Sequence, residues 1–147
     1  MIDHLNIKSQ GRLPQEDEIL NFEKEIGIQL PKSYRQFLLK INAKYISEPH
    51  FAANGKIYEI HGFITFGSGE STIEQNYRNL KEHFENRYIG FAFDSGGWQY
   101  IISIEQNENY GKIYFCRMDE EIDNATTLIA NSFEIFINGL HLSPDFL

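Results

Sequence analysis

The chain is poor in cysteine, proline and basic residues for its 147 positions. One cysteine, Cys116, excludes an intramolecular disulfide and a cysteine-based zinc centre. No stretch approaches the ~20 apolar residues of a membrane-spanning helix. Residues 1–14 carry neither the basic start nor the apolar run of a signal peptide. We therefore expect a cytoplasmic protein that does not span a membrane.

Acidic residues outnumber basic ones, 21 to 13, for a net charge of −8. Binding to phosphates needs a basic surface, so this charge argues against a direct nucleic-acid partner. Residues 48–147 carry fifteen Asp/Glu and six Lys/Arg, and much of the excess lies at Asp94, Glu105, Glu108, Asp119, Glu120, Glu121 and Asp123. We consider two interpretations, a solvated face and a surface that attracts a basic partner and speeds association.

Hydrophobic residues make up 41% of the chain and aromatic residues 14%, enough for the core of one domain spanning residues 1–147. Apolar residues recur at helical spacing in residues 15–26 and 31–42, and Gly27 stands where a left-handed C-terminal cap would close the first helix. A third helix is expected from Ser71, with Glu74 completing a capping box, and a fourth from Ser132.

Strands are expected between these helices. Asn54-Gly55 suits the turn of a hairpin, whose second strand we place at residues 56–66. Residues 88–93, 98–104 and 112–118 predict an antiparallel meander, with Gly96 and Gly97 in its first turn. The expected fold is a single α+β domain with a central, mostly antiparallel sheet of about five or six strands, packed by about four helices. We expect a shared core of Tyr34, Phe37, Leu38, Phe91, Phe93, Phe133 and Phe136.

Catalytic signals are weak throughout. The Gly67–Glu70 loop lies between a strand and a helix but lacks the pattern of a phosphate-binding loop, and Glu70 would repel a phosphate. No two histidines have the spacing of a helical metal site. Nothing near Cys116 would lower its pKa, so we interpret it as a buried apolar residue. We expect no enzymatic activity, no metal and no cofactor.

The pentapeptide at residues 94–98 is unusual. Asp94 is expected to accept hydrogen bonds from backbone N–H groups of its own turn. For Trp98 two roles stay open, core packing and contact with a partner, since tryptophan often carries interface energy. Tyr110 is a second candidate aromatic anchor for a partner.

Four segments together resemble the SUKH superfamily, the Smi/Knr-like domain common among bacterial toxin-immunity proteins. They are the acidic helix, Leu-Pro step and Tyr…Phe-Leu helix at residues 22–38, the strand and loop at 60–67, the strand–Asp-x-Gly-Gly–strand at 89–100, and the closing Ser-Phe-x-x-Phe helix at 132–137. Their order and spacing match over about residues 13–140. One departure is Asn42-Ala43, where the family often has Asn-Gly, so we expect a different loop there.

The resemblance implies a single α+β domain that binds and neutralises a cognate toxin, which in this family is often a nuclease. The partner would then be a basic protein domain, contacted through the seven acidic residues together with Trp98 and Tyr110. One alternative is a regulatory or scaffold module that binds proteins without a link to toxins. Another is a small-molecule binder or enzyme that uses the Gly67–Glu70 loop.

Overall fold

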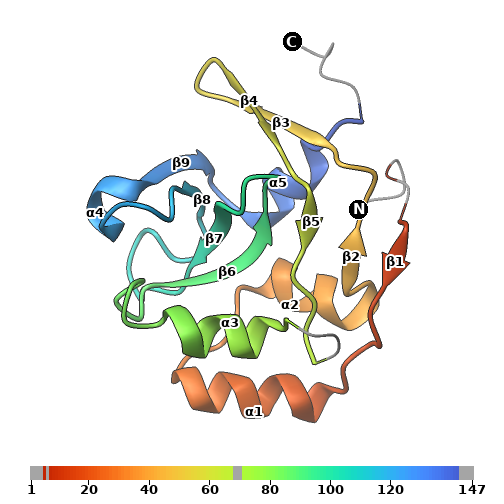
Figure 1. Cartoon of the computed structure of the whole chain (residues 1–147). Coiled ribbons are helices and arrows are strands. Elements are labelled where there is room, and N and C mark those ends of the chain that lie inside the picture. The colour runs from red at the N-terminus through yellow and green to blue at the C-terminus, as the bar shows by residue number, and fades with distance from the viewer. Residues whose placement is uncertain (1–4, 6, 68–70, 143–147) are drawn as a thin grey trace.

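The computed structural model describes residues 5, 7–67 and 71–142, which form one α+β domain around a five-stranded sheet (Figure 1). Its strands follow chain order: β5 (Gly62–Phe63), β6 (Tyr88–Phe93), β7 (Gln99–Ser103), β8 (Ile113–Cys116) and β9 (Thr126–Ala130). Each strand pairs antiparallel with the next. The predicted fold class and the meander are confirmed, whereas β9 was not expected.

In the described part of the chain, two small sheets accompany the main one. Strand β1 (Ser9–Gln10) pairs with β2 (Ala43–Tyr45), and β3 (His50–Ala53) pairs with β4 (Lys56–Glu59) as a hairpin. Asn54 and Gly55 have φ values of 55° and 75°, the left-handed conformation that the predicted turn requires. The second strand, expected over residues 56–66 with a bend or bulge at Gly62, is instead divided in two: the chain leaves the hairpin at Glu59 and joins the main sheet at β5, which begins at Gly62.

The described residues form five helices: α1 (Glu16–Ile26), α2 (Lys32–Lys40), α3 (Ile73–Leu80), α4 (Ile122–Ala125) and α5 (Phe133–Asn138). Gly27 closes α1 with a φ of 82°, and the Ser132 side chain accepts a hydrogen bond from the Ile135 N–H at the start of α5. Both caps are therefore confirmed. Helix α3 begins differently from the prediction, because Thr72 is its N-cap and accepts a hydrogen bond from the Gln75 N–H.

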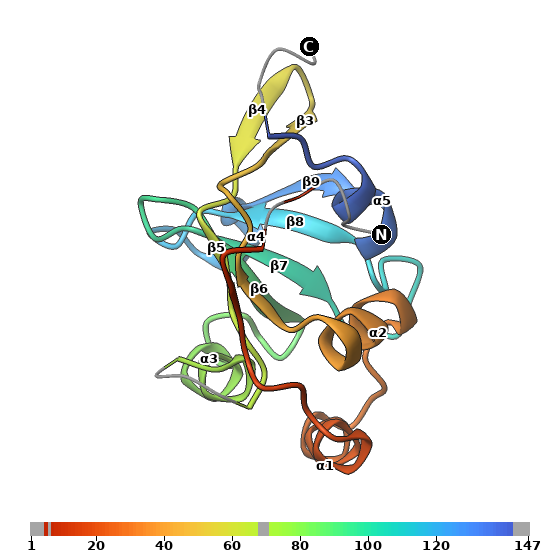
Figure 2. The ribbon, with the colours of Figure 1, turned by 90° about the vertical axis from the view of Figure 1, so that its right-hand side faces the viewer.

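The two faces of the sheet are covered by different helices. Helices α2 and α5 lie on the same side (Figure 2), where the Phe133 ring centroid is 5.1 Å from that of Tyr34, 5.2 Å from Phe37 and 5.5 Å from Phe91. On the other face a smaller apolar cluster joins the turn after α3, strands β6 to β8, and α4; its members are Phe84, Tyr88, Ile101, Cys116, Ile122 and Ala125.

One aromatic residue departs from the predicted core. The pairing of β6 with β7 shifts register between Gly90 and Ala92, as a β-bulge does. Simple alternation would place Phe93 beside Phe91, but the extra residue turns Phe93 to the opposite face, where it is only partly buried. The other six predicted residues are buried together, so the prediction is wrong for Phe93 alone.

Candidate partner-binding surface

The turn between β6 and β7 is held by two carboxylates, one from the turn itself and one from β4. One carboxylate oxygen of Asp94 accepts hydrogen bonds from the N–H groups of Gly96 (3.0 Å) and Trp98 (2.9 Å). Gly97 has a φ of 90°, whereas Gly96 does not adopt a positive φ. A further hydrogen bond, from the Ser95 N–H to the Glu59 carboxylate (2.7 Å), ties the turn to the end of β4.

Trp98 is half-buried. Its ring lies edge-on to Phe115, with centroids 5.8 Å apart. The ring centroid of Phe115 in turn lies 5.2 Å from that of Tyr58 in the hairpin and 5.2 Å from that of the buried Tyr100. The side chain therefore packs on the domain while keeping part of its surface open, which leaves contact with a partner available to it.

Three of the seven acidic candidates are paired with arginine. Arg87, just before β6, donates hydrogen bonds to Glu105 and to Asp123 (2.7 Å). Its hydrogen bond lowers the pKa of Glu105 below the usual range of a glutamate. Arg117 is paired with Glu120. Because Arg87 lies outside residues 94–123, counting charges within that segment overestimates its excess of negative charge.

The remaining acidic candidates belong to three different connections, with Asp94 after β6, Glu108 between β7 and β8, and Asp119 and Glu121 between β8 and α4. Glu108, Asp119 and Glu121 are exposed. Tyr110 is half-buried, and its hydroxyl donates to the Gln29 carbonyl (2.6 Å) between α1 and α2. The turn at Asp94 and the loop after β7 lie at opposite ends of a five-residue strand, about 16 Å long. The candidates thus form separate groups and not one continuous surface.

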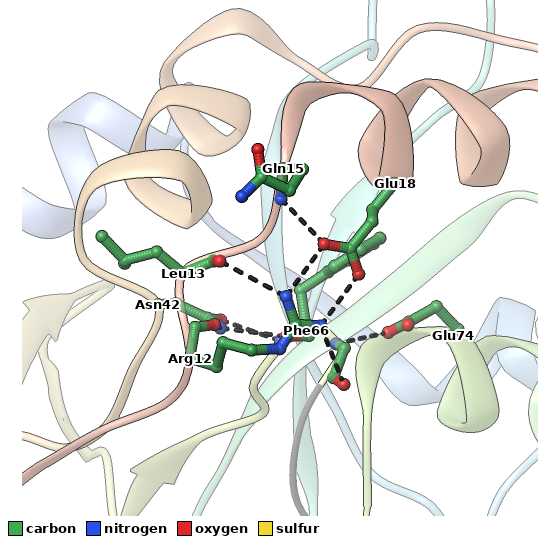
Figure 3. A network of polar contacts seen from close by, with 8 residues as sticks. Arg12, Leu13, Gln15, Glu18, Asn42, Phe66 and Glu74 are labelled. Atoms are coloured by element: carbon green, nitrogen blue, oxygen red, sulfur yellow. Dashed lines mark hydrogen bonds and ion pairs between the residues drawn. The ribbon is translucent and has the colours of Figure 1, made fainter.

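A buried polar network ties the segment before α1, the end of α2 and the chain after β5 to one another (Figure 3). The Asn42 side chain is fully buried and donates to the carbonyls of Arg12 (2.7 Å) and Phe66 (2.9 Å). Its oxygen accepts from the Phe66 N–H at 2.8 Å. Asn42 has a φ of 44° and closes α2 in a left-handed conformation, which asparagine tolerates well. The left-handed residue here is thus Asn42 itself, and Ala43 already belongs to β2.

Carboxylates surround the start of the Gly67–Glu70 loop. Glu18 makes a two-pronged ion pair with Arg12 and accepts from the Gln15 N–H, and these contacts lower its pKa to about 2. Glu74 accepts from the Gly67 N–H (3.1 Å) instead of completing the predicted capping box, so that part of the prediction is wrong. The Gly67 N–H, which a phosphate would need as a donor, is therefore already bound by Glu74. The rest of the loop, residues 68–70, lies outside the described residues.

A cavity of about 360 Å³ opens between β2, α3 and the main sheet. Two of its lining residues, Asn76 and Gln99, exchange hydrogen bonds through their amides at 3.0 and 3.1 Å. The pair lies over Gly90, where a Cβ atom would come within 2.0 Å of the Gln99 side-chain oxygen. A glycine inside a strand of otherwise bulky residues was the one sequence signal for this close approach.

The structure also places the residues with potential catalytic or metal-binding chemistry. Cys116 is buried in β8, and burial raises its pKa to about 11. Among residues 5, 7–67 and 71–142, no three His, Cys, Asp or Glu side chains are grouped so that they could hold a metal ion. Within the same residues, none of the helices is both long and apolar enough to cross a membrane.

These features define a small α+β domain in which partly buried aromatic side chains, Trp98 and Phe115 among them, lie beside the Asp94 turn. The chain matches the model of the SMI1/KNR4 family (SUKH-1) over residues 13–139 and belongs to this family. It is also similar to the SPbeta prophage-derived uncharacterized protein YokK of Bacillus subtilis (strain 168), at 25% identity over 159 residues, covering 91% of this chain and 80% of the relative. The resemblance to the SUKH superfamily is thereby confirmed.

Proposed function

We propose that this protein is an immunity protein, which binds a basic toxin domain in the cytoplasm and neutralises it. Membership of the SUKH-1 family is the observation that carries the proposal. The net charge of −8 supports it, since a toxin that acts on nucleic acid needs a basic surface and would be attracted to an acidic partner.

The proposed mechanism is binding without catalysis. A nucleophilic cysteine needs a lowered pKa, whereas burial raises that of Cys116 to about 11. The carboxylates Glu18 and Glu74 beside Gly67 are engaged with Arg12 and with the Gly67 N–H. Because Glu74 already accepts from the Gly67 N–H, this donor is taken, which argues against the alternative of an anionic small-molecule ligand or nucleotide at this loop.

The proposal predicts a toxin gene beside this gene, and co-expression of this protein with the toxin encoded there tests it. We expect restored growth of the host and a complex that survives purification. A regulatory or scaffold module, the main alternative, would give neither result with the toxin yet would retain other protein partners. Purified protein should also show no hydrolysis of nucleotides or nucleic acid; metal-dependent turnover lost on changing Asp94 or His61 would contradict the non-catalytic part of the proposal.

A further inference from the structure

Three half-buried aromatic side chains meet beside the Asp94 turn. They are Tyr58 from β4, Trp98 from the end of the turn and Phe115 from β8, and we call them the Trp98 patch. Phe115 lies between the other two, with ring centroids 5.2 Å from Tyr58 and 5.8 Å from Trp98. Segments distant in sequence thus combine to expose aromatic surface at one place, and aromatic residues dominate the energy of protein interfaces.

Two carboxylates border this patch, Glu59 next to Tyr58 and Asp94 at the start of the turn. Each engages one oxygen with the backbone of the turn: Glu59 with the Ser95 N–H, and Asp94 with the N–H groups of Gly96 and Trp98. The second oxygen of each has no hydrogen-bond partner among residues 5, 7–67 and 71–142, and neither carboxylate forms an ion pair with a cation in that part of the chain.

These two charges differ from the other acidic candidates. Glu105, Glu120 and Asp123 are each paired with an arginine of the chain itself. Glu59 and Asp94 are half-buried, which strengthens their field relative to a fully exposed carboxylate. Both also act on the nearby Tyr100, whose pKa is raised first by burial and then by these two charges.

A guanidinium group matches this combination of aromatic faces and uncompensated carboxylates. It is flat, so it stacks on an aromatic ring, and it carries several donors that can reach carboxylate oxygens at the same time. A lysine ammonium lacks the flat face, and a phosphate would be repelled. We propose that the Trp98 patch is a docking surface for an arginine side chain of the protein partner. This inference rests on the proposed function, because it assumes that the partner is a basic protein.

The first experiment uses the unchanged protein and needs no toxin. Trp98 is the chain's one tryptophan, so its fluorescence and its indole N–H signal in an NMR spectrum both report on the patch. The probe is a short acetylated peptide with one arginine, and the control peptide carries citrulline, which has nearly the same shape without the charge. We expect the arginine peptide to shift both Trp98 signals and the citrulline peptide to leave them unchanged. Equal responses to the two peptides would overturn the proposal.

The second experiment measures affinity for the toxin domain encoded beside this gene. Glu59→Gln with Asp94→Asn removes both charges but keeps the oxygens that accept from the turn. The matched control, Asp17→Asn with Glu82→Gln, removes two exposed carboxylates elsewhere. We expect the first variant to bind at least about tenfold more weakly than the control, since a lost partner for a desolvated arginine is costly. Melting temperatures verify that both variants are folded.

The outcomes separate this inference from the proposed function. If both variants bind the toxin equally well, the docking surface is elsewhere although the immunity function stands. If the unchanged protein binds no toxin while the arginine peptide still shifts the Trp98 signals, the immunity function fails and the arginine site stands.

Discussion

At the scale of single residues, the Asp94 turn shows how one side chain and one glycine fix the position of Trp98. The Asp94 carboxylate accepts hydrogen bonds from the backbone N–H groups of Gly96 and Trp98, so the turn cannot open without losing both. Gly97 supplies the positive φ of 90° that lets the chain reverse. The position of Trp98 in the aromatic patch therefore depends on the backbone conformation of this turn. A substitution at Gly97 should disturb that conformation.

We predict that Gly97→Val lowers the free energy of unfolding by about 1–3 kcal/mol, because a side chain at this φ is strained. No atom lies within 4 Å of a Cβ at this position, so the cost reflects strain and not a clash. Gly96→Ala is the control: its Cβ would lie 3.5 Å from an Asp94 oxygen, an ordinary contact, and it should cost less than about 0.5 kcal/mol. Urea denaturation measures both. Equal stability of the two variants would show that the strain is absent.

At the scale of elements, the Asn42 side chain links three segments of the chain: the segment before α1, the end of α2 and the segment after β5. Its amide bonds to Arg12 before α1 and to both polar backbone groups of Phe66 after β5. All of this happens where α2 ends, so one buried side chain aligns three elements. Figure 3 shows these contacts converging beside the ion pair of Arg12 with Glu18.

We predict that Asn42→Ala costs about 3 kcal/mol or more, because it leaves the buried N–H and carbonyl of Phe66 without partners. Asn54→Ala is a matched control, since Asn54 also has a positive φ of 55° but makes an exposed hydrogen bond to Leu128. It should cost about 1 kcal/mol. Hydrogen exchange at the Phe66 amide should accelerate only in the Asn42 variant. Equal costs would mean that left-handed strain, and not the buried network, dominates at Asn42.

Elements with local signals could be predicted from the sequence. Gly27 and Ser132 mark helix ends through contacts within a few residues, and the Asn54-Gly55 turn specifies its hairpin in the same way. Strand β9 (Thr126–Ala130) was missed because it follows α4 directly, without a turn signal, and its conformation depends on pairing with β8. Glu74 was mispredicted for the same reason, a tertiary contact. Its spacing from Ser71 suggests a capping box, but its carboxylate accepts a hydrogen bond from the Gly67 N–H instead.

The candidate site was predictable only in part, for a related reason. The turn at Asp94 and the partial exposure of Trp98 follow from adjacent residues. Tyr58 and Phe115 complete the patch from other strands, and only the packing of the hairpin on the sheet brings them together. Likewise, no local pattern shows that Arg87 neutralises Glu105 and Asp123.

At the scale of the whole molecule, negative charge is distributed unevenly and partly compensated. Arg87 and Arg117 hold three of the acidic side chains between residues 94 and 123, while Asp119 and Glu121 remain exposed beside α4. A basic partner would therefore meet a field from several separate groups. Such a field acts mainly on the rate of encounter, whereas buried aromatic contacts set the rate of dissociation.

We predict that Glu120→Lys with Glu121→Lys slows association with the toxin about threefold to tenfold at low salt while leaving the fold intact. Loss of the exposed ion pair between Glu120 and Arg117 should cost at most about 1 kcal/mol. The effect should shrink between about 0.01 M and 0.15 M salt, because the Debye length falls from about 30 Å to about 8 Å. Stopped-flow measurements of the association rate across this range test the prediction.

Asp17→Lys with Glu82→Lys is the control, because it changes the net charge equally through two exposed residues elsewhere on the chain. If the field near α4 guides the partner, the Glu120/Glu121 variant should associate more slowly than this control at low salt, and the two should converge as salt rises. Equal slowing would assign the effect to the total charge of −8 and not to this surface. The two substitutions could instead leave the association rate unchanged and raise the dissociation rate. That result would show that Glu120 and Glu121 contact the partner directly in the complex.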